Sequence, residues 1–219
     1  MNRNLLDLLK IYCTKSYFDY LQEINNKNKE NIINLFTDLL ILYINDLNSS
    51  TLREIITIEV ANFSHLKSKL GYDGFQQSSV TDKIQYCEIK PVNCYQKSDG
   101  TYNKKLCGQG NFTDFSWKKL AHIKNDDIKM IISGFYSGKL LYILSFDFNE
   151  SLFLNKLENQ LQHNFPNGDL KGFWLRSANF NYKDYENASS LKIIYRNKDL
   201  KNYINLFSKK FFLLLKKIN

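Results

Sequence analysis

Along the first seventy residues, apolar side chains recur at the spacing of an α-helix, which predicts a largely helical segment. The first apolar face combines Leu5, Leu8, Leu9 and Tyr12. A stronger stripe follows, and it consists of Ile32, Ile33, Phe36, Leu39, Leu40 and Tyr43. A third helix is expected from Leu52 to Lys69, because residues 49–51 offer an N-terminal cap and Gly71 offers a C-terminal one.

The middle of the chain has the apolar runs and turn residues that are typical of β-strands. Three strands are expected there, over residues 84–90, 128–135 and 140–148. Ser137 and Gly138 separate the second strand from the third by a tight turn. These two strands should therefore form an antiparallel hairpin.

Helical spacing returns in the last third of the chain. A helix is expected from Glu150 to Gln162, a strand over residues 191–195, and a final helix from Leu200 to Ile218. Taken along the chain, the elements predict a mixed α/β fold in which helices flank a mixed central β-sheet.

Length and composition suit one compact domain. The chain has 219 residues, of which 43% are hydrophobic, and no linker-like run interrupts it. We therefore expect a single domain over residues 1–219, with a helical N-terminal region in residues 1–50 and the core in residues 51–219.

The chain is basic, with a formal net charge of +8, which is compatible with a polyanionic partner such as nucleic acid. Lys, Asn and Ile are abundant throughout, so part of this excess reflects overall composition. The N-terminus lacks the apolar core of a signal peptide, and the most apolar window, residues 35–44, is too short to span a bilayer. A cytoplasmic location without membrane association is therefore expected.

The four cysteines show no CxxC spacing, and they are Cys13, Cys87, Cys94 and Cys107. A zinc site built on them would need a further ligand such as His122, at a spacing unlike that of familiar zinc motifs. Reduced thiols of a cytosolic protein are the favoured interpretation.

The residues with the clearest chemical role are Asp73 and the run Glu88-Ile89-Lys90. Because side chains alternate along a strand, Glu88 and Lys90 project from the same face, and burying such a pair without partners is costly. Asp73 lies far enough before Glu88 for a turn and a neighbouring strand to bring the two carboxylates together. Two carboxylates suit Mg²⁺, and the lysine can orient a metal-bound water for attack on phosphorus.

At these residues the chain resembles the PD-(D/E)xK nuclease superfamily, and type II restriction endonucleases in particular. Asp73 and Glu88-Ile89-Lys90 match the motif, whereas Tyr72 stands where the family often has proline. The resemblance implies a restriction-endonuclease-like core with Mg²⁺ as cofactor. It also implies that Asp73, Glu88 and the Ile89 carbonyl hold the metal, and that Lys90 positions the water.

Three alternatives remain open at this site. Glu59 lies in the preceding helix, where relatives often supply an auxiliary carboxylate, but it could equally be a surface charge. Asp82 competes with Asp73 as the first carboxylate, although it leaves little chain for a turn and a second strand before Glu88. Glu88 and Lys90 could also be an ordinary ion pair on a solvated strand.

Two polar segments are candidates for DNA contact, because lysines suit phosphates and Asn, Gln and Arg side chains pair with base edges. The loop over residues 95–110 contributes Gln96, Lys97, Asn103, Lys104, Lys105 and Gln109. A second segment interrupts an aromatic run and contributes Arg176, Ser177, Asn179 and Asn181. An exposed loop without a ligand is the alternative for each.

Together these features predict a type II restriction endonuclease that cuts both strands of a short duplex DNA site. The resemblance implies Mg²⁺-dependent hydrolysis that leaves 5′-phosphate and 3′-hydroxyl ends. A homodimer is expected, because a two-fold protein matches a palindromic site. The alternatives are a repair, recombination or structure-selective nuclease, and a non-catalytic DNA-binding protein.

Overall fold

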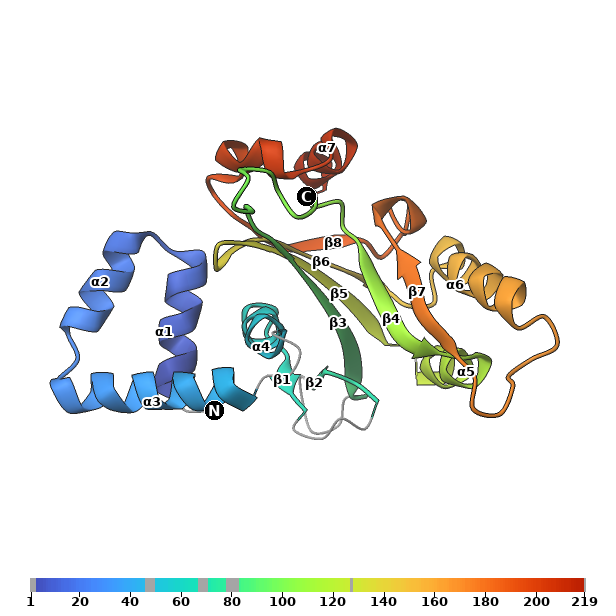
Figure 1. The fold of residues 1–219 in the computed structure, drawn as a ribbon, viewed down its shortest axis with the longest axis horizontal. Coiled ribbons are helices and arrows are strands. Elements are labelled where there is room, and N and C mark those ends of the chain that lie inside the picture. Colours follow the sequence, from blue (N-terminus) through green and yellow to red (C-terminus); the bar gives the residue numbers. More distant parts are fainter. Residues whose placement is uncertain (1–2, 46–49, 67–70, 78–82, 127, 219) are drawn as a thin grey trace.

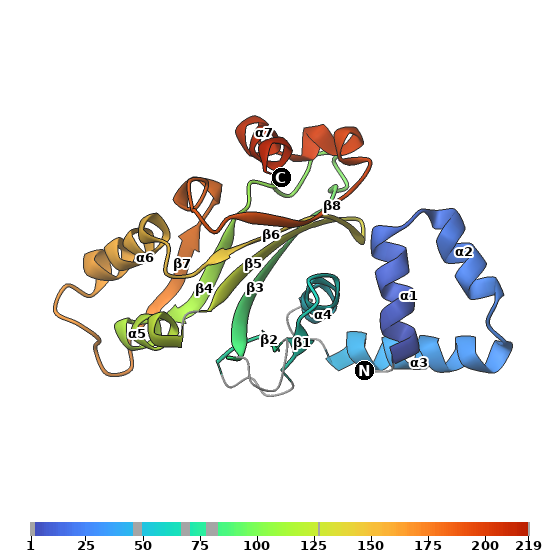
Figure 2. The ribbon, with the colours of Figure 1, turned by 180° about the vertical axis from the view of Figure 1, so that it is seen from behind.

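The computed structural model describes residues 3–45, 50–66, 71–77, 83–126 and 128–218. The expected mixed α/β fold is confirmed: a six-stranded mixed sheet and a separate two-stranded sheet are surrounded by helices (Figure 1). The helical N-terminal region lies at one end of the molecule, as the view from behind also shows (Figure 2). None of the described helices is long and apolar enough to cross a membrane.

The six-stranded sheet has the order β1-β2-β3-β5-β6-β8. Its strands are β1 (Ser64–His65), β2 (Gly74–Gln76), β3 (Gln85–Cys94), β5 (Lys129–Tyr136), β6 (Lys139–Asp147) and β8 (Lys192–Arg196). All neighbours are antiparallel except β3 and β5, which run parallel. A parallel pair needs a crossover connection, which β4 (Gly110–Phe115) and α5 (Trp117–Asp126) provide.

Two layers cover the sheet. On one face lie α1 (Arg3–Thr14) and α4 (Thr51–Val60), whose apolar side chains pack against Cys87 and Ile89 of β3. The other face carries the small sheet formed by β4 and β7 (Leu175–Phe180). It also carries the helices α6 (Ser151–Asn164), η1 (Tyr182–Asp184), η2 (Leu200–Leu206) and α7 (Lys209–Lys217). Glu88 and Lys90 therefore project toward the β4–β7 side, as the strand alternation predicts.

The predicted hairpin is confirmed. Tyr136 pairs with Lys139, so β5 and β6 are joined by the two residues Ser137 and Gly138. Both adopt positive φ angles, 47° and 76°, which is the backbone of the tight turns that match the twist of a hairpin. The helix over α6 and the strand over β8 are also found close to their expected bounds.

The third helix ends nine residues earlier than Lys69, the end that the sequence pattern predicts. Asn62 follows α4 with a φ of 59°, and its N–H donates to the Glu59 carbonyl, while the Phe63 N–H donates to the Ile58 carbonyl at 3.0 Å. This is a Schellman motif with asparagine in place of the usual glycine. The chain can therefore turn back and place β1 and β2 beside β3, which brings Asp73 to the sheet.

The final helix is also interrupted. Instead of one helix from Leu200 to Ile218, the chain forms η2 and then α7, with Phe207 extended between them. Leu106 inserts its backbone at this point: its N–H donates to the Leu206 carbonyl, and its own carbonyl accepts the N–H of Ser208. A contact with a segment about a hundred residues away thus overrides the local helical pattern.

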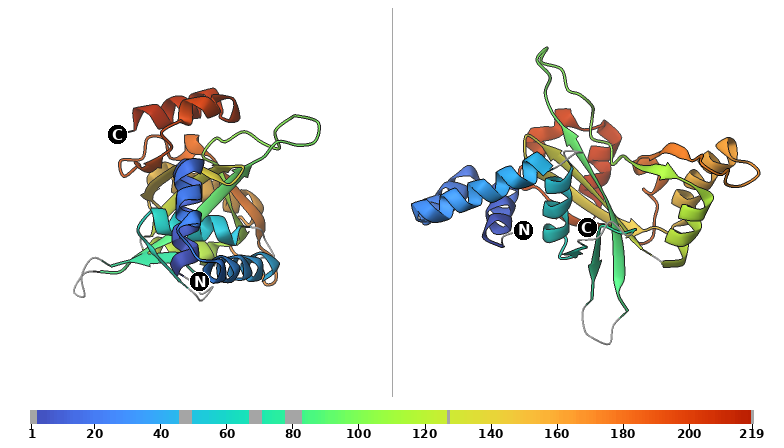
Figure 3. Two further views of the ribbon diagram at one scale, coloured as in Figure 1. Left: turned by 90° about the vertical axis from the view of Figure 1, so that its left-hand side faces the viewer. Right: turned by 60° about the horizontal axis from the view of Figure 1, so that its bottom comes forward.

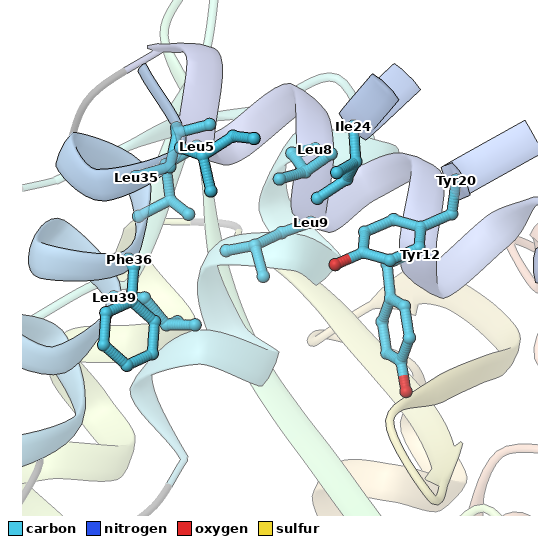
Figure 4. A pocket seen from close by; sticks show the side chains of 10 residues that line it. Leu5, Leu8, Leu9, Tyr12, Tyr20, Ile24, Leu35, Phe36 and Leu39 are labelled. Carbon is cyan, nitrogen blue, oxygen red and sulfur yellow. The ribbon is translucent and has the colours of Figure 1, made fainter. Parts of the chain in front are cut away.

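The apolar stripe of α3 (Lys29–Asn45) is only partly used within the chain. Leu35 is buried against α1 and α2 (Tyr17–Asn25), and the three helices enclose an apolar pocket of about 310 Å³ (Figure 4). Ile33 and Phe36, however, remain 54% and 59% exposed. The N-terminal region therefore leaves a large apolar surface uncovered.

Candidate active site

The Asp73 carboxylate lies over the middle of β3. Asp73 continues the pairing of β2 with β3, because its backbone N–H donates to the Cys87 carbonyl at 3.0 Å. Its side-chain Oδ2 accepts a hydrogen bond from the Ile89 N–H at 2.7 Å. The short strand β2 follows Asp73 directly, and its antiparallel pairing with β3 places Asp73 beside Glu88 and Lys90.

Glu88 and Lys90 form an ion pair on the same face of β3, in which the Lys90 ammonium donates to Glu88 Oε1. Glu88 is only 8% exposed. The ammonium also lies 5.0 Å from the centre of the Phe112 ring in β4, a cation–π arrangement that helps hold it in place. Asp73, Glu88 and Lys90 therefore form one compact cluster, hereafter the acidic–lysine cluster.

The electrostatics of the cluster are those of two carboxylates sharing one lysine. Burial and the neighbouring Glu88 carboxylate raise the pKa of Asp73 to about 7, although Lys90 and the Ile89 N–H act in the opposite direction. Burial alone would lower the pKa of Lys90, but the carboxylates of Glu88 and Asp73 outweigh it and raise that pKa. Lys90 is accordingly an ammonium at neutral pH, and so acts as a cation and hydrogen-bond donor.

Glu59 is not brought to the cluster. It faces α1, where Arg3 donates to it at 2.7 Å and the Lys10 ammonium lies 3.8 Å away. The glutamate of α4 that does approach the cluster is Glu54, which lines a pocket together with Lys90 and contributes to raising the pKa of Asp73. The two glutamates are five positions apart in α4, so they point about 140° apart around the helix axis.

The sequence pattern does not show that Glu54, and not Glu59, lies near the cluster, and the reason is physical. Both glutamates flank the same apolar stripe of α4, formed by Ile55, Ile56 and Ile58, so periodicity alone does not distinguish them. The two glutamates differ in their surroundings because α1 packs over Glu59. That contact joins segments more than fifty residues apart and leaves no local signal.

These two glutamates provide a matched pair for mutation. If the acidic–lysine cluster cleaves DNA with Mg²⁺, Glu54→Gln is expected to lower the cleavage rate by about tenfold or more, because it removes a negative charge beside the cluster. Glu59→Gln should leave that rate within about twofold of wild type and cost roughly 1 kcal/mol of stability at most. Initial cleavage rates and urea unfolding curves measure the two effects. Equal rates for both variants would contradict the assignment of Glu54.

A pocket of about 660 Å³ opens beside the cluster, with β3 as its floor, the start of α4 on one side and the β4–β7 sheet on the other. Four of the predicted DNA-contacting residues line it, and they are Lys104, Gln109, Asn179 and Asn181. Lys90 and the Ile89 backbone reach the same pocket. The structure therefore brings parts of both predicted DNA-contacting segments to the same pocket as β3.

The other predicted DNA-contacting residues do not line this pocket. Gln96, Lys97 and Asn103 belong to a loop that extends away from the body of the molecule (Figure 3). The Asn103 side chain is used within that loop, because it accepts from the Tyr95 N–H and donates to the Asn93 carbonyl. Lys105 and Arg176 are exposed, and Ser177 is half-buried.

The four cysteines are not gathered at one place in the described part of the chain. All four thiols are free, and three of them are buried. Within the described ranges, no three side chains of His, Cys, Asp or Glu come together as a metal-binding group. Among the described residues, those that would hold a metal at the acidic–lysine cluster are Asp73 and Glu88, through their carboxylates, and Ile89, through its backbone carbonyl. Asp82, the competing first carboxylate, lies outside the described residues.

No protein-family model and no curated protein matches the chain. The functional interpretation therefore depends on the geometry and chemistry of the acidic–lysine cluster and the pocket beside it.

Proposed function

We propose that this protein is a Mg²⁺-dependent endonuclease of the PD-(D/E)xK type, acting on duplex DNA as a type II restriction enzyme does. The observation that carries the proposal is the convergence of Asp73 on the backbone of Ile89, directly between Glu88 and Lys90. An ordinary ion pair on a solvated strand would not place a second half-buried carboxylate there.

The donor set fits a hard divalent cation. Asp73 Oδ2 and Glu88 Oε1 are engaged by the Ile89 N–H and by Lys90, and the second oxygen of each carboxylate takes no part in those two bonds. Together with the Ile89 carbonyl, these oxygens supply the ligand type that Mg²⁺ prefers. Burial and, after it, the neighbouring Glu88 carboxylate raise the pKa of Asp73, so the ionised pair lacks sufficient compensating positive charge. Bound Mg²⁺ would supply that charge, and would favour hydroxide over water at the attacking position.

In this proposal, the side chains of Lys90, Glu88 and Glu54 have separate functions at the site. Lys90, as an ammonium, orients the attacking water and compensates the negative charge that develops on the phosphate. Glu88 holds the Lys90 ammonium through their ion pair, and Phe112 restricts it from the β4 side. Glu54, at the edge of the pocket, accepts a proton or a hydrogen bond from the water.

The homodimer is part of the same proposal, and the exposed apolar side chains of α2 and α3 support it. Tyr17 and Phe18 at the start of α2, and Ile33 and Phe36 in α3, are each more than half exposed. Residues 17–40 contain four acidic and two basic side chains, a net charge of −2 in a chain whose net charge is +8. The net charge of this segment disfavours DNA, and a second copy of the chain would cover its exposed apolar side chains.

In solution, the wild-type protein is expected to have twice the 25.8 kDa mass of one chain. A variant with Ile33→Ser and Phe36→Ser should sediment as a monomer, because it removes apolar area from the centre of the interface. Leu213→Ser in α7, which alters a comparably exposed apolar residue, should leave the dimer intact. A monomeric wild-type protein at micromolar concentration would refute this arrangement.

The nuclease proposal is tested by incubating the protein with long duplex DNA of varied sequence, in Mg²⁺ or in EDTA. Discrete Mg²⁺-dependent fragments whose ends share a sequence support a restriction enzyme. Cleavage governed by nicks, flaps or junctions instead favours a repair or recombination nuclease. Binding without cleavage favours a non-catalytic DNA-binding protein.

A further inference from the structure

We infer that the two-stranded β4–β7 sheet reads base edges in the major groove of the bound duplex, with Asn111 and Asn179 as its specificity-determining residues. The inference rests on the proposed nuclease function, and it concerns adenine-containing positions of the DNA site. It adds Asn111 and Thr113 to the DNA-contacting residues, and it assigns recognition to this sheet in place of the extended loop over residues 95–103.

The two faces of this sheet differ sharply in chemistry. Its inner face is apolar and buried, and it consists of Phe112, Phe115, Ala178 and Phe180. Its outer face carries two cross-strand pairs, Asn111 with Asn179 and Thr113 with Ser177. The four side chains of these two pairs are uncharged amides or hydroxyls, and the same strands also expose the charged residues Asp114 and Arg176. Phosphate contact would favour lysine or arginine at these positions, whereas neutral amides suit base edges.

Hydrogen bonds orient the outer side chains. Asn111 Nδ2 donates to Ser177 Oγ at 3.2 Å, and Ser177 Oγ donates to Asn179 Oδ1 at 3.1 Å. Among the described residues, no side-chain hydrogen bond engages the acceptor oxygen of Asn111 or the donor nitrogen of Asn179. A donor and an acceptor side by side complement adenine, which presents N6 as a donor and N7 as an acceptor in the major groove.

The backbone of the sheet is fixed relative to the catalytic lysine. A Cβ at Gly110 would lie 2.9 Å from Lys90 Cβ, so the first residue of β4 packs directly on the catalytic strand. At Asn179, the Gln160 side chain of α6 accepts the backbone N–H at 2.9 Å and donates to the carbonyl at 3.1 Å. Rigid support of this kind is what a recognition element requires.

The outer face and the acidic–lysine cluster also share one cavity. Asn111, Thr113 and Asn179 line the 660 Å³ pocket that Lys90 and Lys104 reach. A two-stranded sheet has dimensions that the major groove admits. A duplex whose phosphate lies at Lys90 would therefore present its base edges to this face, with Lys104 placed to contact a phosphate.

The test selects DNA by binding, so that it does not depend on cleavage. A Glu88→Gln protein is used to enrich duplexes from a randomised library, and the bound pool is sequenced. We expect a consensus that contains adenine. Adding Asn111→Ala and Asn179→Ala should remove the preference at one or more positions, with a tenfold to hundredfold loss of discrimination at each. Adding Asn187→Ala, at an exposed asparagine away from the pocket, should leave the consensus unchanged.

Two results would overturn the inference: no consensus from the Glu88→Gln protein, or a consensus that survives in the Asn111→Ala/Asn179→Ala protein. Circular dichroism shows whether the added substitutions preserve the fold. Failure of the nuclease proposal is distinguishable, because it appears as wild-type protein that selects the consensus but does not cut it in Mg²⁺.

Discussion

Replacing Lys90 with methionine is expected to lower the rate of Mg²⁺-dependent DNA cleavage by about 10³-fold. Methionine keeps an unbranched chain over the Phe112 ring but removes the ammonium. The water at the reacting centre then loses its donor, and charge that develops on the phosphate loses its counter-charge. Single-turnover cleavage of an end-labelled duplex measures the effect without interference from product release.

The control is a second lysine in a similar environment. Lys129 of β5 forms an ion pair with Asp147 of β6, and its side chain is 30% exposed compared with 19% for Lys90. Lys129→Met should retain cleavage within about twofold of wild type, because Lys129 is outside the acidic–lysine cluster. A Lys90→Met protein that folds normally and cuts at the wild-type rate would show that Lys90 is structural.

Asp73→Asn is expected to abolish cleavage and, in the absence of divalent ions, to stabilise the protein. Asparagine can still accept the Ile89 N–H through its side-chain oxygen, so the local hydrogen bond is kept. It removes a carboxylate whose ionised form is disfavoured by burial and by Glu88. At pH 8 we expect a gain on the order of 2 kcal/mol in the free energy of unfolding, together with a loss of about 10³-fold in cleavage rate.

The pH dependence of this gain follows from the direction of the pKa change. In the folded protein the Asp73 pKa is raised from 3.8 to about 7, so between these values the folded state binds more protons than the unfolded state. Asp73 therefore makes wild-type stability fall as pH rises through this window. The stability difference between Asp73→Asn and wild type should be largest above pH 7 and should nearly vanish near pH 4.

Urea unfolding at pH 5 and pH 8, with and without Mg²⁺, measures these effects. Mg²⁺ should stabilise the wild-type protein and leave Asp73→Asn unchanged, because binding to the folded state alone shifts the unfolding equilibrium. An Asp73→Asn protein that is less stable than wild type at both pH values would indicate a structural carboxylate instead of a functional one.

Much of the fold and of the cluster could be predicted because the relevant signals are local. The alternation along residues 84–90 predicts that Glu88 and Lys90 share a face, and the spacing from Asp73 predicts that a second carboxylate can join them. The β5–β6 hairpin is specified by its two turn residues. In each case the residues that decide the structure are close together in the sequence.

The features that could not be predicted depend on distant contacts. The β4–β7 sheet joins segments about sixty residues apart, and each is a short run with alternation too brief to be recognised as a strand.

The early end of α4 has a local cause that the sequence pattern does not reveal. Asn62 adopts a left-handed conformation there, and asparagine does so less readily than glycine. Pro91 continues β3 toward its end, although proline normally weakens a strand assignment.

The most direct test of the account is whether purified wild-type protein cuts supercoiled plasmid DNA in Mg²⁺ and a Glu88→Gln protein, prepared identically, does not. Glutamine preserves the shape of the buried side chain but removes one carboxylate and weakens its hold on Lys90. We predict cleavage by wild type that EDTA abolishes, and a rate for Glu88→Gln lower by at least about 10²-fold. Equal cleavage by both proteins, or none by folded wild type on varied plasmids, would contradict the proposal.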